Sequence, residues 1–272
     1  MAASESLEPL HVLYEARDLP SASLPGDLER LHGGAFALAP DCVYANFVAT
    51  LDGVVAIPGL EHSNDFVAGN SDADRFLMGV LRAYADVVLI ASGVLRASPQ
   101  GTWRPEKIYP PAADAYAELR EHLGLARHPE VAVLTGRGTV DPTHPLFATG
   151  AVVLTSEAGA ARLAGSLPPA STIVTLGHST TIAPQAVVDA LRARGHRRVL
   201  CEAGPHTFGE LLSANLVDEL FLTSSPLLVG EAEPGSRLRL VEGTDLAPRE
   251  IRPRLLSVRS HGSHLFLRYA LR

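Results

Sequence analysis

The sequence has little of what marks several common protein classes. Its 272 residues hold only two cysteines, Cys42 and Cys201, which lie in apolar runs without metal-ligand spacing and are expected to be buried reduced thiols. No apolar run approaches the ~20 residues of a membrane span, and no signal peptide is visible. The formal charge is −7 and no long basic run occurs, which argues against a nucleic-acid surface. We expect a soluble cytoplasmic protein that binds neither membrane nor nucleic acid.

The composition is that of a folded protein with a large core, because 46% of the residues are hydrophobic and 19% are charged. No repeat or low-complexity linker divides the chain. We therefore expect one domain over residues 41–272 and an N-terminal extension, residues 1–40, packed on it. Within the extension, residues 10–14 are typical of an edge strand and residues 26–32 of a short helix.

From residue 43 onward, short apolar runs alternate with helical patterns. This alternation predicts an α/β fold with a largely parallel central sheet flanked by helices. After Gly230 the pattern changes to strands without a long helix, and the tight turn His261-Gly262-Ser263 predicts a C-terminal antiparallel hairpin. The predicted strands are 43–51, 86–91, 131–135, 151–155, 172–176, 198–203, 219–225, 237–241, 255–260 and 265–271, and the main predicted helices begin near residues 71, 110, 157, 184 and 205.

The stretch from His196 to Gly230 carries the clearest functional pattern. A buried strand over 198–203 ends at Gly204, and Pro205 suits the first position of the helix that follows. Glycine at such a bend lets the backbone approach a ligand, and the free N–H groups of a first helical turn favour an anion.

The motifs of this stretch resemble the riboflavin-biosynthesis reductase family, the C-terminal reductase domain of bifunctional deaminase-reductases. The similar segments are Glu202-Ala203-Gly204-Pro205, Leu211-Leu212, Val217-Asp218-Glu219-Leu220 and the run 225–230. The resemblance implies a dihydrofolate-reductase-like fold, NADPH as cofactor and, in many members, a homodimer. The zinc motifs of the deaminase half do not occur, so we expect neither that activity nor a metal.

The resemblance also assigns the substrate side of the site. Thr50-Leu51-Asp52-Gly53 is similar to the family's Ser-Leu-Asp-Gly, and Arg82 and Glu202 match residues that face substrate there. We expect Asp52 and Glu202 as catalytic groups and Thr50, Arg75 and Arg82 as substrate contacts, the two arginines sharing one helix face. The alternatives remain a turn cap for Asp52, an internal partner for Glu202, and pairing of the arginines with Asp72, Asp74 or Asp86.

The cofactor is expected at the turns that follow the parallel strands. Each glycine there has turn geometry as its alternative role, and Arg137 is either a 2′-phosphate contact or a plain surface residue. Val94 stands where the family has a threonine that binds cofactor, and a lost neutral hydrogen bond costs roughly 0.5–1.5 kcal/mol. The expected cofactor residues are Ser92, Gly93, Val94, Leu95, Gly136, Arg137, Thr155, Ala203, Gly204, Pro205, His206, Thr207 and Phe208.

The leading hypothesis is an NADPH-dependent reductase that transfers hydride to C1′ of a ribosylamino-pyrimidine phosphate. One alternative is a reductase of the same fold with another substrate, such as a pterin or a xenobiotic. The other is a non-catalytic nucleotide-binding protein, which the replacements at Val94 and Ser98 suggest. The hairpin residues 265–267 are either a dimer interface or core.

Overall fold

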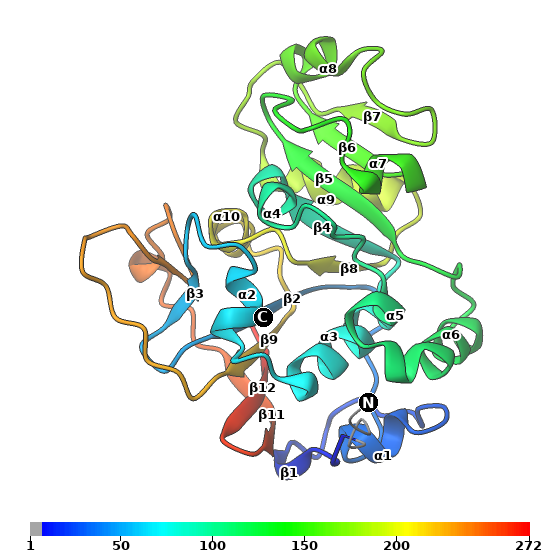
Figure 1. The fold of residues 1–272 in the computed structure, drawn as a ribbon, viewed down its shortest axis with the longest axis vertical. Helices are drawn as coiled ribbons and strands as arrows, with labels where there is room; N and C mark the ends of the chain where they lie inside the picture. Colours follow the sequence, from blue (N-terminus) through cyan, green and yellow to red (C-terminus); the bar gives the residue numbers. More distant parts are fainter. Residues whose placement is uncertain (1–6) are drawn as a thin grey trace, which may run out of the picture.

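A single ten-stranded sheet forms the centre of the computed structural model, which describes residues 7–272 (Figure 1). Its strand order is β1-β11-β12-β9-β2-β8-β4-β5-β6-β7. The strands are β1 His11–Glu15, β2 Cys42–Ala49, β4 Val87–Ala91, β5 Glu130–Thr135, β6 Val152–Thr155, β7 Thr172–Thr175, β8 Arg198–Cys201, β9 Glu219–Ser224, β11 Arg254–His261 and β12 His264–Ala270.

Strands β9, β2, β8, β4, β5, β6 and β7 pair with their neighbours in parallel, and β12, β11 and β1 continue the sheet in antiparallel pairs. The predicted fold class is therefore confirmed, including the C-terminal antiparallel hairpin. Because the parallel strands run in one direction, they all end at one edge of the sheet, here called the carboxyl edge.

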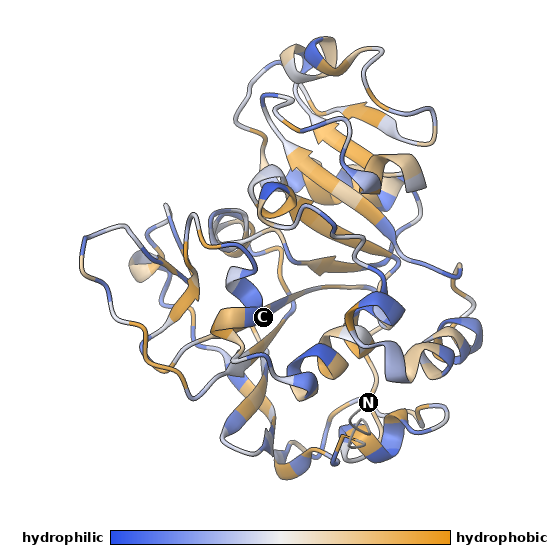
Figure 2. Cartoon of the chain, in the orientation of Figure 1, coloured by the Kyte–Doolittle hydropathy of each residue, from blue (hydrophilic) through white to orange (hydrophobic). Residues whose placement is uncertain are grey.

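Helices cover both faces of the sheet. On one face α1, α3 and α6 contribute Leu28, Phe76 and Tyr116 to an apolar cluster, and on the other α9 and α10 contribute Leu191 and Phe208. The central strands are correspondingly hydrophobic (Figure 2). The helices are α1 Leu28–His32, α2 Ser63–Val67, α3 Asp72–Tyr84, α4 Ser92–Ala97, α5 Pro105–Ile108, α6 Ala113–His122, α7 Pro145–Thr149, α8 Glu157–Leu163, α9 Pro184–Ala193 and α10 Pro205–Ser213.

The N-terminal segment forms the edge strand and the short helix that its sequence predicts. β1 pairs with β11, and the fully buried Leu28 of α1 joins the same apolar cluster as α3. The first six residues of the expected extension lie outside the described residues. The far edge of the sheet is β7, so the two edges lie at opposite ends of the molecule (Figure 1).

One predicted C-terminal strand is shorter than expected, and the structure bears on whether the hairpin residues are core or interface. The strand expected over residues 237–241 shrinks to β10, Leu238–Arg239, which pairs outside the main sheet with β3, Val54–Ala56. In the hairpin, β12 lies between β11 and β9, and Phe266 is buried, so this side chain is core. Leu265 is 39% exposed, and the homodimer stays a prediction.

Among residues 7–272, no helix is both long and apolar enough to span a membrane. The same residues contain no cluster of three or more His, Cys, Asp or Glu side chains arranged to hold a metal ion.

Candidate active site

The turns predicted to bind ligand come together at the carboxyl edge. β8 lies between β2 and β4, so the turns after these three strands are adjacent. The turn after β2 contains Asp52, the residue after β4 is Ser92, and the residue after β8 is Glu202. The alternation of strands and helices in the sequence predicts this grouping, because parallel strands all end at the same edge of the sheet.

Gly204 forms the bend between β8 and α10. Its backbone has φ of 83° and ψ of 172°, a region that is essentially limited to glycine. A Cβ built on Gly204 would lie 3.5 Å from Cγ2 of Val94, so the turn after β8 faces the turn after β4. α10 then begins at Pro205, and the first-turn N–H groups of a helix have no partner within the helix. Two turns and a helix start thus frame a place for an anionic group.

Several predicted cofactor residues have buried side chains. The side chains of Ala203, of Phe208 in α10 and of Leu95 in α4 are buried in the two apolar clusters. Thr155 is fully buried, and its hydroxyl donates a 2.5 Å hydrogen bond to the Thr135 carbonyl oxygen. Helical and strand periodicity had placed these positions near the turns without showing which way their side chains point, and any ligand contact from them is limited to the backbone.

The remaining predicted cofactor residues differ in how far they are exposed to solvent. Gly93, Arg137 and His206 are exposed, Ser92 and Val94 are half-buried, and Pro205 and Thr207 are buried. Gly136 has a packing reason to be glycine, because a Cβ there would lie 1.8 Å from the Thr180 carbonyl oxygen.

Glu202, which follows β8, and Arg82, in the last turn of α3, face each other. Arg82 Nε donates to Glu202 Oε1 at 3.1 Å, and Nη2 donates to Oε2 at 2.7 Å, a bidentate pair of the strong kind. Both side chains are about 10% exposed. The internal partner that sequence reasoning left open for Glu202 is therefore Arg82, and the two residues form one unit.

Arg120 of α6 holds the end of α3 that carries Arg82. Its Nη1 donates to the carbonyl oxygens of Arg82, Ala83 and Ala85 at 3.3, 3.0 and 2.8 Å. The Arg82 carbonyl oxygen also accepts from the Ala85 N–H at 3.2 Å. Ala83 lies in the last helical turn and Ala85 just after it, where carbonyl oxygens have no partner within the helix. Arg120 is 2% exposed, so a buried cation caps α3.

Asp52 and Thr50 hold a loop through internal hydrogen bonds. The Thr50 hydroxyl donates to Asp52 Oδ1 at 2.5 Å, and the Gly230 N–H donates to Oδ2 at 2.6 Å. The Thr50 hydroxyl also accepts from the Val54 N–H at 2.9 Å. The Thr50 bond, the Gly230 N–H and that of Val229 lower the pKa of Asp52 to about 2, so its carboxyl is ionised and occupied.

Arg75 also departs from its prediction. It donates to Asp65 at 3.0 Å and to Asp72 at 3.1 Å, whereas Arg82 turns to Glu202. Although seven residues apart on α3, the two guanidinium groups have different partners and do not form a joint clamp. The alternative of pairing with Asp72 is the one found for Arg75.

Asp74 lies in the first turn of α3, and the sequence suggests it only as a possible partner of the arginines. The Ser71 hydroxyl accepts a hydrogen bond from the Asp74 N–H at 3.3 Å. The Asp74 side chain, however, is only 5% exposed. Burial raises its pKa to about 6, against a lowering by the Thr223 hydroxyl on β9. Its spacing relates Asp74 to Arg82: Asp74, Met78 and Arg82 follow at i, i+4 and i+8 and so lie on one ridge of α3.

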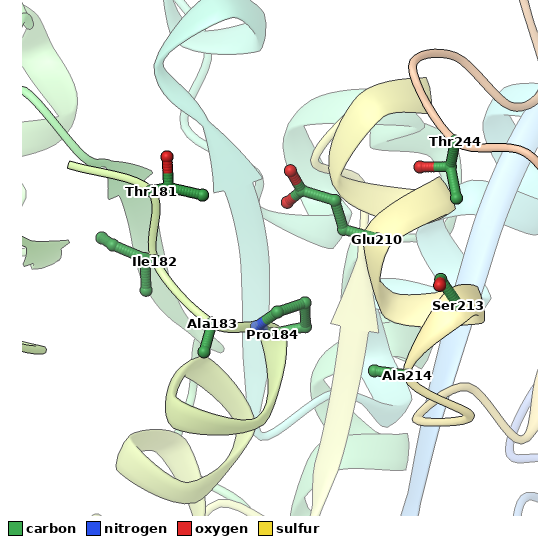
Figure 3. Close-up of a pocket in the computed structure, with 8 residues that line it drawn as sticks. All are labelled: Thr181, Ile182, Ala183, Pro184, Glu210, Ser213, Ala214 and Thr244. Carbon is green, nitrogen blue, oxygen red and sulfur yellow. The ribbon is translucent and has the colours of Figure 1, made fainter. Parts of the chain in front are cut away.

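One hollow in the surface lies apart from these residues. It has a volume of about 500 Å³ and lies between the start of α9 and the outer side of α10, where Glu210 faces Thr181 (Figure 3). α9 and α10 cover the face opposite to α3, and none of the predicted site residues lines the hollow. The hollow is lined by Thr181, Ile182, Ala183, Pro184, Glu210, Ser213, Ala214 and Thr244.

A family model described as the RibD C-terminal domain matches residues 41–265. The chain is a member of the RibD C-terminal domain family. Members of this family are NAD(P)H-dependent reductases. The match covers the carboxyl edge, Arg82, Glu202 and β11, and ends within the first residues of β12.

Known proteins with this RibD C-terminal domain differ widely from the chain in sequence. A 2,5-diamino-6-ribosylamino-4(3H)-pyrimidinone 5′-phosphate reductase of Archaeoglobus fulgidus is 24% identical over 191 residues, which cover 69% of this chain and 81% of that protein. A pyrimidine reductase-like protein of Corynebacterium diphtheriae superposes with a TM-score of 0.68 and 22% identity over 90% of this chain and 99% of that one. Acinetobacter baumannii RibD gives 0.63 and 18%, covering 85% of this chain and 58% of RibD. The structural likenesses show a common fold.

Proposed function

We propose that this protein is an NADPH-dependent reductase that acts on C1′ of a ribosylamino-pyrimidine phosphate. The observation that carries the proposal is the meeting of Gly204 and Val94 beside the Arg82–Glu202 pair. A bend restricted to glycine, a helix start and a polar pair at one edge suit an anionic cofactor next to a polar substrate. The name of the Archaeoglobus relative supports the choice of substrate.

The residues present fit the cofactor. The first-turn N–H groups of α10 would hold its diphosphate, and the exposed Arg137 would meet its 2′-phosphate. When bound, the reduced nicotinamide supplies two electrons and one hydrogen to C1′. Glycine at 204 keeps this approach free of a side chain.

The Arg82–Glu202 pair would address the substrate. The pair uses Nε and Nη2 of Arg82, so Nη1 is outside it and can donate to a ribose or phosphate oxygen. Glu202 fixes the guanidinium plane, which orients that donor before substrate arrives. The pair thus positions the sugar rather than reacting with it.

The test is titration with NADPH followed by turnover. The melting temperature should rise with NADPH, and the fluorescence of the single tryptophan, Trp103, should change. Wild-type protein should then consume NADPH at 340 nm with the ribosylamino-pyrimidine phosphate. An Arg137→Gln variant should lose affinity for NADPH but keep its affinity for NADH. Absence of any response to millimolar NADPH would overturn the proposal.

One observation favours a second candidate, a reductase of a different heterocycle without a phosphate group. Arg75 and Arg82, the predicted phosphate clamp, are both engaged in ion pairs with carboxylates. Comparison of the phosphorylated pyrimidine with its dephosphorylated form separates the candidates. Equal kcat/KM for the two forms favours the second candidate, and a large preference for the phosphate favours the first.

A further inference from the structure

Another hollow lies at the edge of the sheet opposite to the candidate active site. Asp86, Glu130, Ala151, Thr172 and His196 line it, and each of them lies just before a parallel strand or begins one. This hollow, beyond the amino ends of the parallel strands, is here called the amino-edge hollow. Its volume is about 510 Å³, within the range of roughly 300–1,000 Å³ that is usual for small-molecule sites. None of the residues assigned to substrate or cofactor lines it.

The two carboxylates in the wall of the amino-edge hollow already have partners. Glu130 Oε1 accepts from Arg194 Nη2 at 2.8 Å, and His196 Nε2 lies 2.6 Å from Glu130 Oε2. Asp86 Oδ2 accepts from the backbone N–H groups of residues 197–198 at 2.7 and 2.6 Å. Neither carboxylate is therefore the partner of the other positively charged groups in the wall.

Arg120 brings a buried guanidinium group to the amino-edge hollow, with 2% of the residue exposed. Its Nε donates to the Ala126 carbonyl oxygen at 2.6 Å, and its Nη1 donates to the carbonyl oxygens at the end of α3. Within residues 7–272, Nη2 makes no hydrogen bond. Because a buried charged group is unfavourable without partners, the N–H groups of Nη2 are suited to an anion in the hollow.

Arg104 and His128 line the same hollow and add to its positive character. Arg104 is half-buried and forms no ion pair within the described part of the chain. His128 Nδ1 is buried without a hydrogen bond, and Glu106 Oε1 lies 3.5 Å from it. Burial lowers the pKa of His128 and Glu106 raises it, whereas the charges of Arg104, Arg127 and Arg120 lower it. Three guanidinium groups thus lie near one ring.

The rest of the wall is largely apolar. Val131 at the start of β5, Leu146 of α7 and Ala151 before β6 are buried and line the hollow. Leu125 and Pro129, from the segment between α6 and β5, complete this side. A ligand would therefore meet positive charge on one side and apolar side chains on the other, which is the usual make-up of a small-molecule site.

We propose that the amino-edge hollow binds a small organic anion. Its phosphate or carboxylate group accepts hydrogen bonds from Arg104 and from Nη2 of Arg120. Its apolar part lies against Leu125, Val131 and Leu146. The site is separate from the proposed reductase site and does not depend on that function.

Four probes test the site on the full chain: phenyl phosphate, benzoate, inorganic phosphate and benzyl alcohol. The first two have both an anionic group and an apolar ring, inorganic phosphate has only the charge, and benzyl alcohol has only the ring. The readout is the fluorescence of Trp103, the single tryptophan, because it lies between Thr102 and Arg104, which both line the hollow.

We expect phenyl phosphate or benzoate to change this fluorescence and to bind about tenfold or more tightly than the other two probes. A preference for phenyl phosphate identifies a phosphate as the natural anionic group, and a preference for benzoate identifies a carboxylate. Inorganic phosphate that binds as tightly as both ring-bearing anions would overturn the apolar half of the site.

Two variants locate the binding. Arg104→Gln removes one donor, and Thr102→Glu places a carboxylate in the wall of the hollow. Each should weaken binding of the ring-bearing anion by about tenfold or more, since charge-assisted hydrogen bonds are the strong ones. Arg137→Gln is the control, because it removes one positive charge at the carboxyl edge and should leave the dissociation constant unchanged. The melting temperature without ligand shows that each variant is folded.

The outcomes separate this site from the proposed function. Absence of binding by both ring-bearing anions at millimolar concentration overturns the proposal. Binding that persists in Arg104→Gln and Thr102→Glu but is lost in Arg137→Gln also overturns it, because the anion would then lie at the proposed cofactor position. A wild-type protein that does not bind NADPH contradicts the proposed function alone, since no step of this test uses NADPH.

Discussion

Arg82 and Glu202 are 120 residues apart in the chain and are joined by two parallel hydrogen bonds of 3.1 and 2.7 Å. α3 supplies one side and the end of β8 the other. The pair therefore ties a helix to the strand whose following turn contains Gly204. In the proposed site, this contact would connect the substrate side with the cofactor side.

Breaking this pair should cost more than breaking an exposed one. Arg82→Met leaves Glu202 without its partner at about 10% exposure, and we expect a loss of about 3 kcal/mol in the free energy of unfolding. Arg82→Met combined with Glu202→Leu should recover part of the loss. Arg75→Met, in a more exposed pair, should cost about 0–1 kcal/mol. Urea denaturation measures all three, and equal losses for the two arginines would contradict the interpretation.

Gly204→Ala should weaken NADPH binding as well as stability. The backbone at Gly204 is restricted to glycine, so alanine should cost about 1–3 kcal/mol. Gly195, with φ of 90° and no atom within 4 Å of a built Cβ, is the matched control. Gly195→Ala should lower the melting temperature and leave the NADPH dissociation constant unchanged. An unchanged dissociation constant in Gly204→Ala would argue against the bend as the anion site.

Val94→Thr should strengthen NADPH binding. The side chain is half-buried and lies beside Gly204, and threonine has nearly the shape of valine with one hydroxyl added. One neutral hydrogen bond of about 0.5–1.5 kcal/mol corresponds to at most about tenfold in affinity. Isothermal titration calorimetry tests this change, and Val94→Ala controls for altered packing. No gain in affinity would show that the hydroxyl does not reach the cofactor.

Asp74→Asn should change how stability depends on pH. The folded pKa of Asp74, about 6, lies above the ordinary 3.8, so this group stabilises the fold below pH 4 and loses that contribution as pH rises through 6. The lost contribution is at most about 3 kcal/mol. Relative to wild type, Asp74→Asn should therefore gain stability between pH 4 and pH 7. Parallel denaturation curves at pH 4, 5.5 and 7 measure the difference, and a constant difference would contradict the raised value.

The sequence predicted the fold and the carboxyl edge well, because both depend on local patterns. Apolar runs alternating with helical spacing give a parallel sheet, and Gly204-Pro205 marks a bend whose backbone conformation needs glycine. β10 was overestimated because apolar character near residues 237–241 reflects packing beside α10 rather than strand pairing in the main sheet. α4 was missed because Ser92-Gly93 was read only as a turn.

The roles of individual side chains were harder to predict. Asp52 is the right residue type for a site, but the Gly230 N–H that it accepts comes from a segment that spacing does not place. Thr50 and Arg75 have local partners, Asp52 and Asp72, which were open alternatives to a ligand. Thr155 has a hydroxyl at a strand end, yet it points into the sheet. The burial of Asp74 could not be predicted from the sequence, because acidic residues are common at helix starts whether or not they are buried.

Arg120 connects α6 with the backbone of Arg82, although the two residues are 38 positions apart in the chain. Arg120 donates a hydrogen bond to the carbonyl oxygen of Arg82. It thereby helps to fix the backbone that carries the guanidinium proposed to face substrate. A change in how α6 packs would therefore tilt that guanidinium without touching it.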